Sequence, residues 1–273
     1  MRKTREQKRD IFIAPNVGIF DDLDDFKKRK DEYRPSPLFD EFKKIDLRDL
    51  LSHHLSLVVG EPGYGKTYLL RKIVKIAASQ KKEAIFIELK GFTRGDTIAR
   101  IISRQLKQPD AIKTEKFNLT NSNSIIICLD GLDEIRQDIF SEAVERIKEF
   151  LNEYKNTSLL LSCRLNYYQK FPVFEGKKFK IIKLYPFSLK DTREYLEKSD
   201  IPEDTIELIF KKFRFQNRQL VIQTPRYLSL LVFRFLNNIS ISKLLGNSYL
   251  LHFPFPSEDS WHLINFVKVL ENP

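Results

Sequence analysis

The sequence lacks the features that mark a disulfide scaffold, a zinc site or a membrane protein. Its 273 residues include only two cysteines, Cys128 and Cys163, and both lie in apolar runs of strand length. We therefore expect two buried thiols rather than a disulfide or a pair of metal ligands. No apolar stretch approaches the length of a membrane span, and no internal repeat is visible.

The N-terminal segment does not fit the pattern of a signal peptide. A basic stretch, 1–9, precedes an apolar one, 11–20, but the apolar stretch contains Pro15 and Asn16 and runs into Asp21. We therefore expect a cytoplasmic protein with no membrane partner.

The basic charge of the chain gives a weaker indication. The formal net charge is +10, which favours an acidic partner such as nucleic acid. Acidic residues alternate with the basic ones, however, as in 24–32, and this pattern is typical of a solvated surface. Nucleic acid is therefore a less favoured partner.

The most specific motif lies at residues 60–67, which read Gly-Glu-Pro-Gly-Tyr-Gly-Lys-Thr. An apolar run of strand length, 55–59, precedes this loop, and a segment of helical periodicity, 68–78, follows it. In that setting a Gly-x4-Gly-Lys-Thr loop binds nucleotide phosphates, because glycine lets backbone N–H groups turn toward the phosphate oxygens. We expect Lys66 to reach the β- and γ-phosphates and the Thr67 hydroxyl to bind Mg²⁺. The predicted nucleotide-binding residues of this segment are Gly60, Glu61, Pro62, Gly63, Tyr64, Gly65, Lys66, Thr67 and Tyr68.

A second motif begins where the apolar run 125–129 ends in Asp130. Neighbouring parallel strands end at one edge of a sheet, so Asp130 should lie beside Thr67 and help to hold Mg²⁺. Asp133 and Glu134 follow and can orient or deprotonate an attacking water molecule. The alternative is that Asp130 only ends a strand and that residues 133–134 cap a helix.

Arg164 follows another apolar run, 158–163. If this run forms the strand next to Asp130, the guanidinium can register the presence of a γ-phosphate. The alternative is an ordinary surface salt bridge.

Strand-like and helix-like runs alternate from residue 50 onward, which predicts an α/β fold. We predict the three-layer sandwich of a P-loop NTPase, with a central five-stranded, mostly parallel sheet of the ASCE type and a small helical lid after it. The first lid helix should begin at Ser188, where Asp191 completes a pattern like a capping box. The predicted parts are a charged leader at 1–48, partly helical around 23–33, an NTPase core at 49–185, a lid at 186–238 and an atypical tail at 239–273.

The string Asp130-Gly131-Leu132-Asp133-Glu134 resembles the Walker B signature of NACHT domains, which belong to the STAND group of signalling ATPases. The loop at 60–67 is similar to their Walker A motif, and 161–164 resembles their sensor 1. The segments 184–188 and 224–231 resemble the start of the NACHT lid and the helix whose proline, here Pro225, packs near adenine. Over 50–236, this resemblance implies a metal role for Asp130, hydrolytic roles for Asp133 and Glu134, and a γ-phosphate contact for Arg164.

The resemblance implies a signalling switch that binds ATP or GTP, with ATP favoured, together with Mg²⁺. It also implies slow hydrolysis, self-association through the NTPase domain and a role in bacterial-type defence. NACHT proteins normally continue into a winged-helix region and a sensor, whereas the composition changes after Asn238, which favours a truncated or frameshifted reading frame. Two alternatives stay open: an AAA-type ATPase associated with DNA, and a truncated nucleotide-binding remnant without effective hydrolysis.

Overall fold

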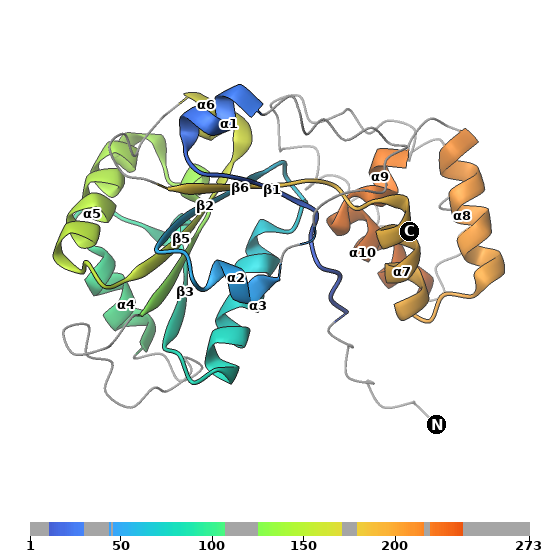
Figure 1. The fold of residues 1–273 in the computed structure, drawn as a ribbon, viewed down its shortest axis with the longest axis horizontal. Helices are drawn as coiled ribbons and strands as arrows, with labels where there is room; N and C mark the ends of the chain where they lie inside the picture. Colours follow the sequence, from blue (N-terminus) through green and yellow to red (C-terminus); the bar gives the residue numbers. More distant parts are fainter. Residues whose placement is uncertain are drawn as a thin grey trace. The chain divides into compact units, whose positions relative to one another are not determined.

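The fold is given by a computed structural model that describes residues 11–29, 44, 46–106, 125–170, 179–215 and 219–236. Contacts divide the chain into two compact units, Met1–Ser229 and Leu230–Pro273. The strands, the helices up to α9 and the start of α10 belong to the first unit (Figure 1). The predicted tail at 239–273 lies outside the described residues.

Six strands form the sheet. They are β1 (Val17–Phe20), β2 (Leu55–Gly60), β3 (Ala84–Glu88), β4 (Ile126–Asp130), β5 (Ser158–Arg164) and β6 (Lys180–Leu184). The α-helices are α1 (Leu23–Arg29), α2 (Leu47–Leu50), α3 (Lys66–Ser79), α4 (Ile98–Leu106), α5 (Phe140–Glu153), α6 (Leu165–Lys170), α7 (Leu189–Lys198), α8 (Glu203–Phe215), α9 (Gln219–Gln223) and α10 (Pro225–Leu236). Short 3₁₀ turns lie at η1 (Leu89–Gly91), η2 (Leu132–Glu134) and η3 (Gln137–Ile139).

The strand order is β1-β6-β2-β5-β4-β3. The five strands from β6 to β3 are parallel, and β5 lies between the loop strand β2 and the acidic strand β4, the order that defines the ASCE type. This confirms the predicted parallel core. The sheet has one strand more than predicted, because β1 pairs with β6 in the antiparallel direction at the sheet edge.

Two apolar clusters fill the two sides of the sheet. Leu57 and Val59 of β2 pack in the cluster that also contains residues of α4 and α5, whereas Val58 packs in the cluster that contains residues of α2 and α3. The alternation follows from the period of two in a β-strand. Helices therefore cover both faces, which confirms the three-layer sandwich (Figure 1).

The two cysteines lie on opposite faces of this sheet. Cys128 belongs to the cluster with α3, Cys163 belongs to the cluster with α5, and both are buried free thiols. Burial raises the pKa of each thiol, which keeps it protonated and unreactive. The prediction of two buried thiols is confirmed.

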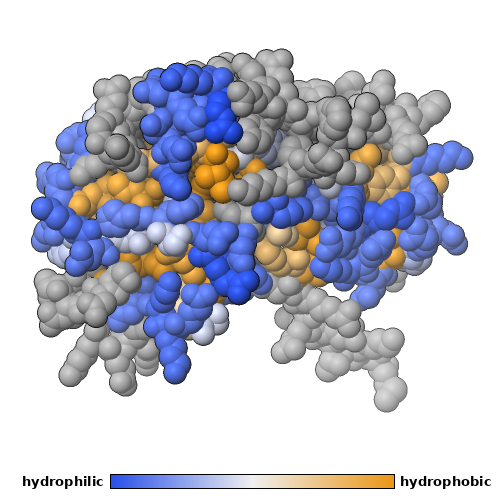
Figure 2. All heavy atoms as spheres, viewed as in Figure 1, coloured by the Kyte–Doolittle hydropathy of each residue, from blue (hydrophilic) through white to orange (hydrophobic). Residues whose placement is uncertain are grey.

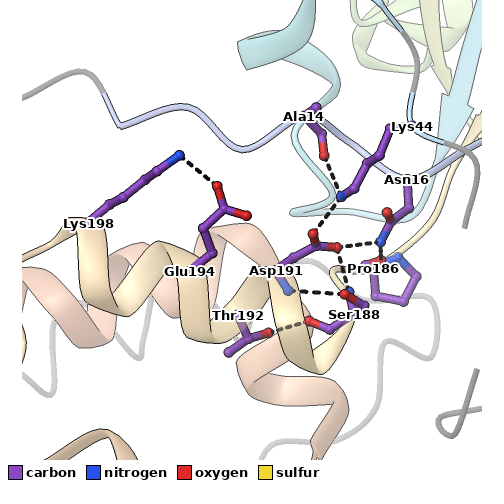
Figure 3. A network of polar contacts seen from close by, with 9 residues as sticks. All are labelled: Ala14, Asn16, Lys44, Pro186, Ser188, Asp191, Thr192, Glu194 and Lys198. Atoms are coloured by element: carbon purple, nitrogen blue, oxygen red, sulfur yellow. Dashed lines mark hydrogen bonds and ion pairs between the residues drawn. The ribbon is translucent and has the colours of Figure 1, made fainter. Parts of the chain in front are cut away.

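Part of the charged leader is fixed to the first lid helix, α7 (Figure 3). The Asp191 carboxylate accepts hydrogen bonds from Lys44 Nζ at 2.6 Å, Asn16 Nδ2 at 2.9 Å and the Ser188 backbone N–H at 2.9 Å. Ser188 Oγ in turn accepts from the Asp191 N–H, so the predicted capping box is present. Burial of Asp191 opposes ionisation, but these hydrogen bonds outweigh it and hold the pKa of the carboxyl below its usual range.

Basic residues on the described surface are mixed with acidic ones. Lys27, Lys148 and Lys198 each form an ion pair with an acid three or four residues away on the same helix. Hydrophilic side chains are spread over the described surface visible in Figure 2 rather than gathered over one element. In the part of the chain that the structure describes, no helix is long and apolar enough to cross a bilayer.

Candidate functional site

The loop at 60–67 joins β2 to α3 and depends on glycine for its backbone conformation. Gly63 has φ +85° and Gly65 has φ +92°, a left-handed region that residues with a Cβ adopt only under strain. Gly65 is also the residue before the first turn of α3, and its lack of a side chain leaves the N–H groups of that turn uncapped. Nothing lies within 4 Å of the position that a Cβ on Gly65 would occupy. Uncapped N–H groups beside open space fit a bound phosphate.

The Lys66 ammonium lies against this loop. It donates hydrogen bonds to the carbonyl oxygens of Gly60 at 2.7 Å and Glu61 at 3.2 Å. Burial lowers the pKa of Lys66, while the negative charge of Asp133 opposes that shift. The ammonium is thus held by two neutral carbonyl oxygens and forms no ion pair with the residues that the structure describes. A cation in that setting suits an anionic ligand.

The strand register brings the predicted residues to one edge of the sheet. Gly60 of β2 lies opposite Arg164 of β5, and Glu88 of β3 lies opposite Asp130 of β4. Because the strands are parallel, the loop, Asp130 and Arg164 all lie at the carboxyl edge.

Asp130 is oriented by Ser162, a fully buried residue of β5. Ser162 Oγ donates to Asp130 Oδ1 at 2.5 Å and accepts from the Gly131 N–H at 2.8 Å. The second carboxylate oxygen of Asp130 accepts no hydrogen bond from the described residues and can face a cation. Sequence reasoning missed Ser162, although a serine inside the apolar run 158–163 was a usable signal.

Asp133 and Arg164 form a close pair. Asp133 Oδ2 lies 2.7 Å from Arg164 Nε, and Asp133 Oδ1 accepts from the Arg164 backbone N–H at 2.9 Å. The Asp133 side chain is 5% exposed and that of Arg164 is 40% exposed. Both oxygens of Asp133 therefore hold Arg164, while part of the guanidinium stays open to solvent.

Glu134 differs from Asp133 in its surroundings. Glu134 is more exposed than Asp133, and its side chain makes no hydrogen bond or ion pair with the residues that the structure describes. Partial burial raises the pKa of the Glu134 carboxyl, and the charges of Asp133 and Asp130 raise it further. A raised pKa makes a carboxylate a better proton acceptor.

Thr67 and Tyr68 lie in the first turn of α3 and are both exposed. Tyr68 contacts the leader: its hydroxyl donates to the Ile11 carbonyl at 3.3 Å, and its ring stacks on Phe12 with centroids 6.0 Å apart. The described residues contain no group of three or more His, Cys, Asp or Glu side chains that could hold a metal ion. Thr67 and Asp130 nevertheless suit Mg²⁺, which keeps much of its water shell and needs few protein ligands.

The start of α10 packs on the apex of the loop. Pro225 is the first residue of this helix, and its neighbour Arg226 donates its backbone N–H to the Gly63 carbonyl at 3.2 Å. A Cβ on Gly63 would stand 3.1 Å from Thr224 Cγ2 and 3.2 Å from Arg226 Cβ. The predicted residue Pro225 thus lies between two residues that touch the loop, and sequence reasoning missed both of them.

The strand order, the glycine loop and the acid at the end of β4 define a P-loop NTPase. The model of the NACHT domain family matches residues 54–201, which is more than half of the chain. The chain belongs to the NACHT family of nucleotide-binding NTPases. No curated protein sequence is significantly similar to it.

Several solved structures resemble the fold at low identity. Orc1 from Aeropyrum pernix, solved in complex with DNA, is 17% identical over 72% of this chain and 59% of its own, with a TM-score of 0.46. AMPPCP-bound DnaA from Aquifex aeolicus is 14% identical over 71% of this chain and 60% of its own, with a TM-score of 0.44. A variant of Thermotoga maritima RuvB is 15% identical over 82% of this chain and 66% of its own, with a TM-score of 0.43. The chain thus spans about three-fifths of the length of Orc1 and DnaA.

Proposed function

We propose that the chain binds ATP or GTP, with ATP favoured, together with Mg²⁺, and hydrolyses the nucleotide slowly. The observation that carries this proposal is the position of Lys66, whose ammonium bonds to two carbonyl oxygens of the glycine loop and to no carboxylate of the described residues. Lys66 is partly buried, and desolvation of a cation that has no carboxylate partner is costly unless an anion completes its environment.

The binding residues are those of the loop and the lid. Backbone N–H groups of 60–67 and the start of α3 surround the phosphates, and Lys66 contacts the β- and γ-phosphates. Pro225 packs near the base. The Thr67 hydroxyl and the outer oxygen of Asp130 would hold Mg²⁺, which would neutralise charge on the phosphate chain.

Asp133 and Glu134 have different roles in hydrolysis: Asp133 positions Arg164, and Glu134 is the general base. Asp133 fixes Arg164, because both of its oxygens are bonded to that residue, and the exposed part of the guanidinium contacts the γ-phosphate. Glu134 orients the attacking water and accepts its proton. The water oxygen bonds to the γ-phosphorus, and the bond from the γ-phosphorus to the bridging oxygen breaks.

The nucleotide state would control self-association through the NTPase domain, as a cytoplasmic switch in defence signalling. Membership of the NACHT family supports this part of the proposal. The mixed surface charge gives no specific support to the alternative of a DNA-associated ATPase.

Calorimetric titration of the purified chain with ATP, ADP and GTP in the presence of Mg²⁺ tests the proposal. Lys66→Ala should abolish measurable binding, because it removes the ammonium that bonds to the loop. Lys75→Ala is the matched control, since it removes the same charge from an exposed position of the same helix and should bind normally. Undiminished affinity in Lys66→Ala would show that the nucleotide does not use this loop.

A further inference from the structure

Arg226 contacts the phosphate loop through its backbone, and its side chain has no role in the site described so far. It is the second residue of α10, and its backbone N–H bonds to Gly63. Its Cβ and Cδ lie 3.2 Å and 3.7 Å from the point that a Cβ on Gly63 would occupy. The aliphatic part of the side chain therefore follows the loop, and the guanidinium, bonded to Cδ, is within reach of a ligand there.

The charge of Arg226 is not neutralised by the described residues. The side chain is exposed and forms no ion pair or hydrogen bond with them. Other arginines in the same unit are paired: Arg164 with Asp133, Arg71 with Glu88, and Arg193 with both Glu203 and Glu207. An arginine whose stem lies on the loop and whose charge the described residues leave unpaired suits an anionic ligand, because a planar guanidinium binds phosphate oxygens through paired hydrogen bonds.

We propose that Arg226 binds the phosphate chain of the nucleotide from the lid and so couples the position of α10 to nucleotide binding. This inference rests on the proposed function, since the phosphate is that of the nucleotide in the loop. Lys66 and Arg164 reach the same chain from α3 and β5, and Arg226 adds a third cation from a different part of the fold.

Gly63 makes this contact feasible. A side chain at that position would press on Thr224 and Arg226, at 3.1 Å and 3.2 Å, and would push the start of α10 away from the loop. Gly63 therefore has two functions. It allows the φ of +85° that the loop needs, and its lack of a side chain lets the start of α10 approach the loop.

The test is a titration of the purified chain with ADP and with a non-hydrolysable ATP analogue, both with Mg²⁺, at low and high salt. Arg226→Ala should weaken binding of at least one nucleotide by roughly tenfold or more, the size expected for a charge-assisted hydrogen bond. The loss should shrink at high salt, because the removed contact is ionic. Arg226→Lys should retain part of the affinity, since a lysine keeps the charge without the planar fork.

Lys211→Ala is the matched control, because it removes one positive charge from an exposed position of the lid helix α8. Thermal unfolding without nucleotide shows whether each variant is folded, and Arg226→Gln replaces Arg226→Ala if the latter is not.

Each outcome decides the inference. If wild type and Lys211→Ala bind nucleotide and the Arg226 variants bind equally well, Arg226 does not contact phosphate and only this inference is wrong. If the loss in Arg226→Ala is the same at all salt concentrations, Arg226 acts through packing, and the inference is again wrong. If wild type does not bind nucleotide, the proposed function fails and the inference fails with it.

Discussion

The phosphate loop and the acidic edge of the site are held in different ways. The loop at 60–67 takes its shape from its own backbone: Gly63 and Gly65 adopt left-handed conformations, and Lys66 bonds to carbonyls of the same loop. The acidic edge, Asp130 to Glu134, takes its shape from side chains of a neighbouring strand. Ser162 orients Asp130, and Asp133 is bonded to Arg164.

Because the loop is held by its own backbone and the acidic edge by side chains of β5, the acidic edge can be changed by mutation while the loop keeps its conformation. A change in the loop acts through backbone strain and alters the site for every ligand. A change at the acidic edge removes one hydrogen-bond partner, so it alters one role and leaves the loop intact. Nucleotide binding and hydrolysis should therefore separate on mutation.

Replacement of Asp133 or Glu134 should have the largest effect on activity, and the two variants should differ in the step that they impair. Glu134→Gln should lower the rate of phosphate release by about 100-fold or more while nucleotide binding is retained, because the amide cannot accept a proton. Asp133→Asn should act differently, since it loosens the hold on Arg164. In the proposed mechanism Arg164 contacts the γ-phosphate, so this variant should bind the triphosphate more weakly and the diphosphate almost normally. Single-turnover phosphate release together with titrations of both nucleotides separates the two effects. Equal loss of hydrolysis with unchanged binding in both variants would contradict the division of roles.

The pH dependence of hydrolysis should follow Glu134 in the wild type. Its pKa is raised above that of an ordinary glutamate, and the carboxylate form is the one that accepts a proton. The rate should therefore be full above the raised pKa and fall as the pH decreases through it. A rate that shows no fall on the acidic side would exclude Glu134 as the base.

Replacement of either glycine of the loop, Gly63 or Gly65, should have the next largest effect, a loss of stability. Gly63→Ala and Gly65→Ala should each lower the free energy of unfolding by about 1–2 kcal/mol through the left-handed backbone. Gly63→Ala should cost about 1–3 kcal/mol more, because its Cβ crowds Thr224 and Arg226, whereas the space beside Gly65 is open. Urea unfolding without nucleotide measures both. Equal losses would show that the start of α10 does not pack on the loop.

Replacement of Ser162 should have the smallest effect on the site, and Ser56 offers a closely matched control. Ser162→Ala removes the hydrogen bonds to Asp130 and Gly131, which should cost about 1 kcal/mol and raise the Mg²⁺ concentration needed for nucleotide binding about fivefold. Ser56→Ala makes the same change on the neighbouring strand β2, where the buried hydroxyl of Ser56 has no hydrogen-bond partner among the described residues. If both variants need the same increase in Mg²⁺ concentration for nucleotide binding, the effect of Ser162→Ala comes from altered packing and not from the orientation of Asp130.

The features that are contiguous in the sequence were predictable. The loop with its flanking strand and helix, the buried strands β4 and β5, and the capping box at Ser188 and Asp191 each depend on residues within a short segment. The alternation of such segments predicted an α/β sheet, and the resemblance to NACHT domains implied the ASCE strand order; both are confirmed.

The features that depend on distant pairs were not predictable. Strand β1 has only four residues and exists because it pairs with β6, far along the chain. The hydroxyl of Ser162 gains its role from β4, so a serine inside the apolar run 158–163 marks a polar position without naming its partner. Arg226 gains its position from the loop and carries no local signal. The engagement of Asp133 with Arg164 likewise appears only when η2 and β5 are placed side by side.

Phosphate release from ATP by the purified chain and by Asp130→Asn, each with Mg²⁺, tests most directly whether the loop and the acidic edge form one catalytic site. We expect slow release by the wild type. We also expect a rate lower by about 100-fold in Asp130→Asn, because the outer carboxylate oxygen that would hold the cation is lost while the Lys66 loop stays intact. Equal release rates in the two proteins, or no release by a wild type that binds ATP, would contradict it.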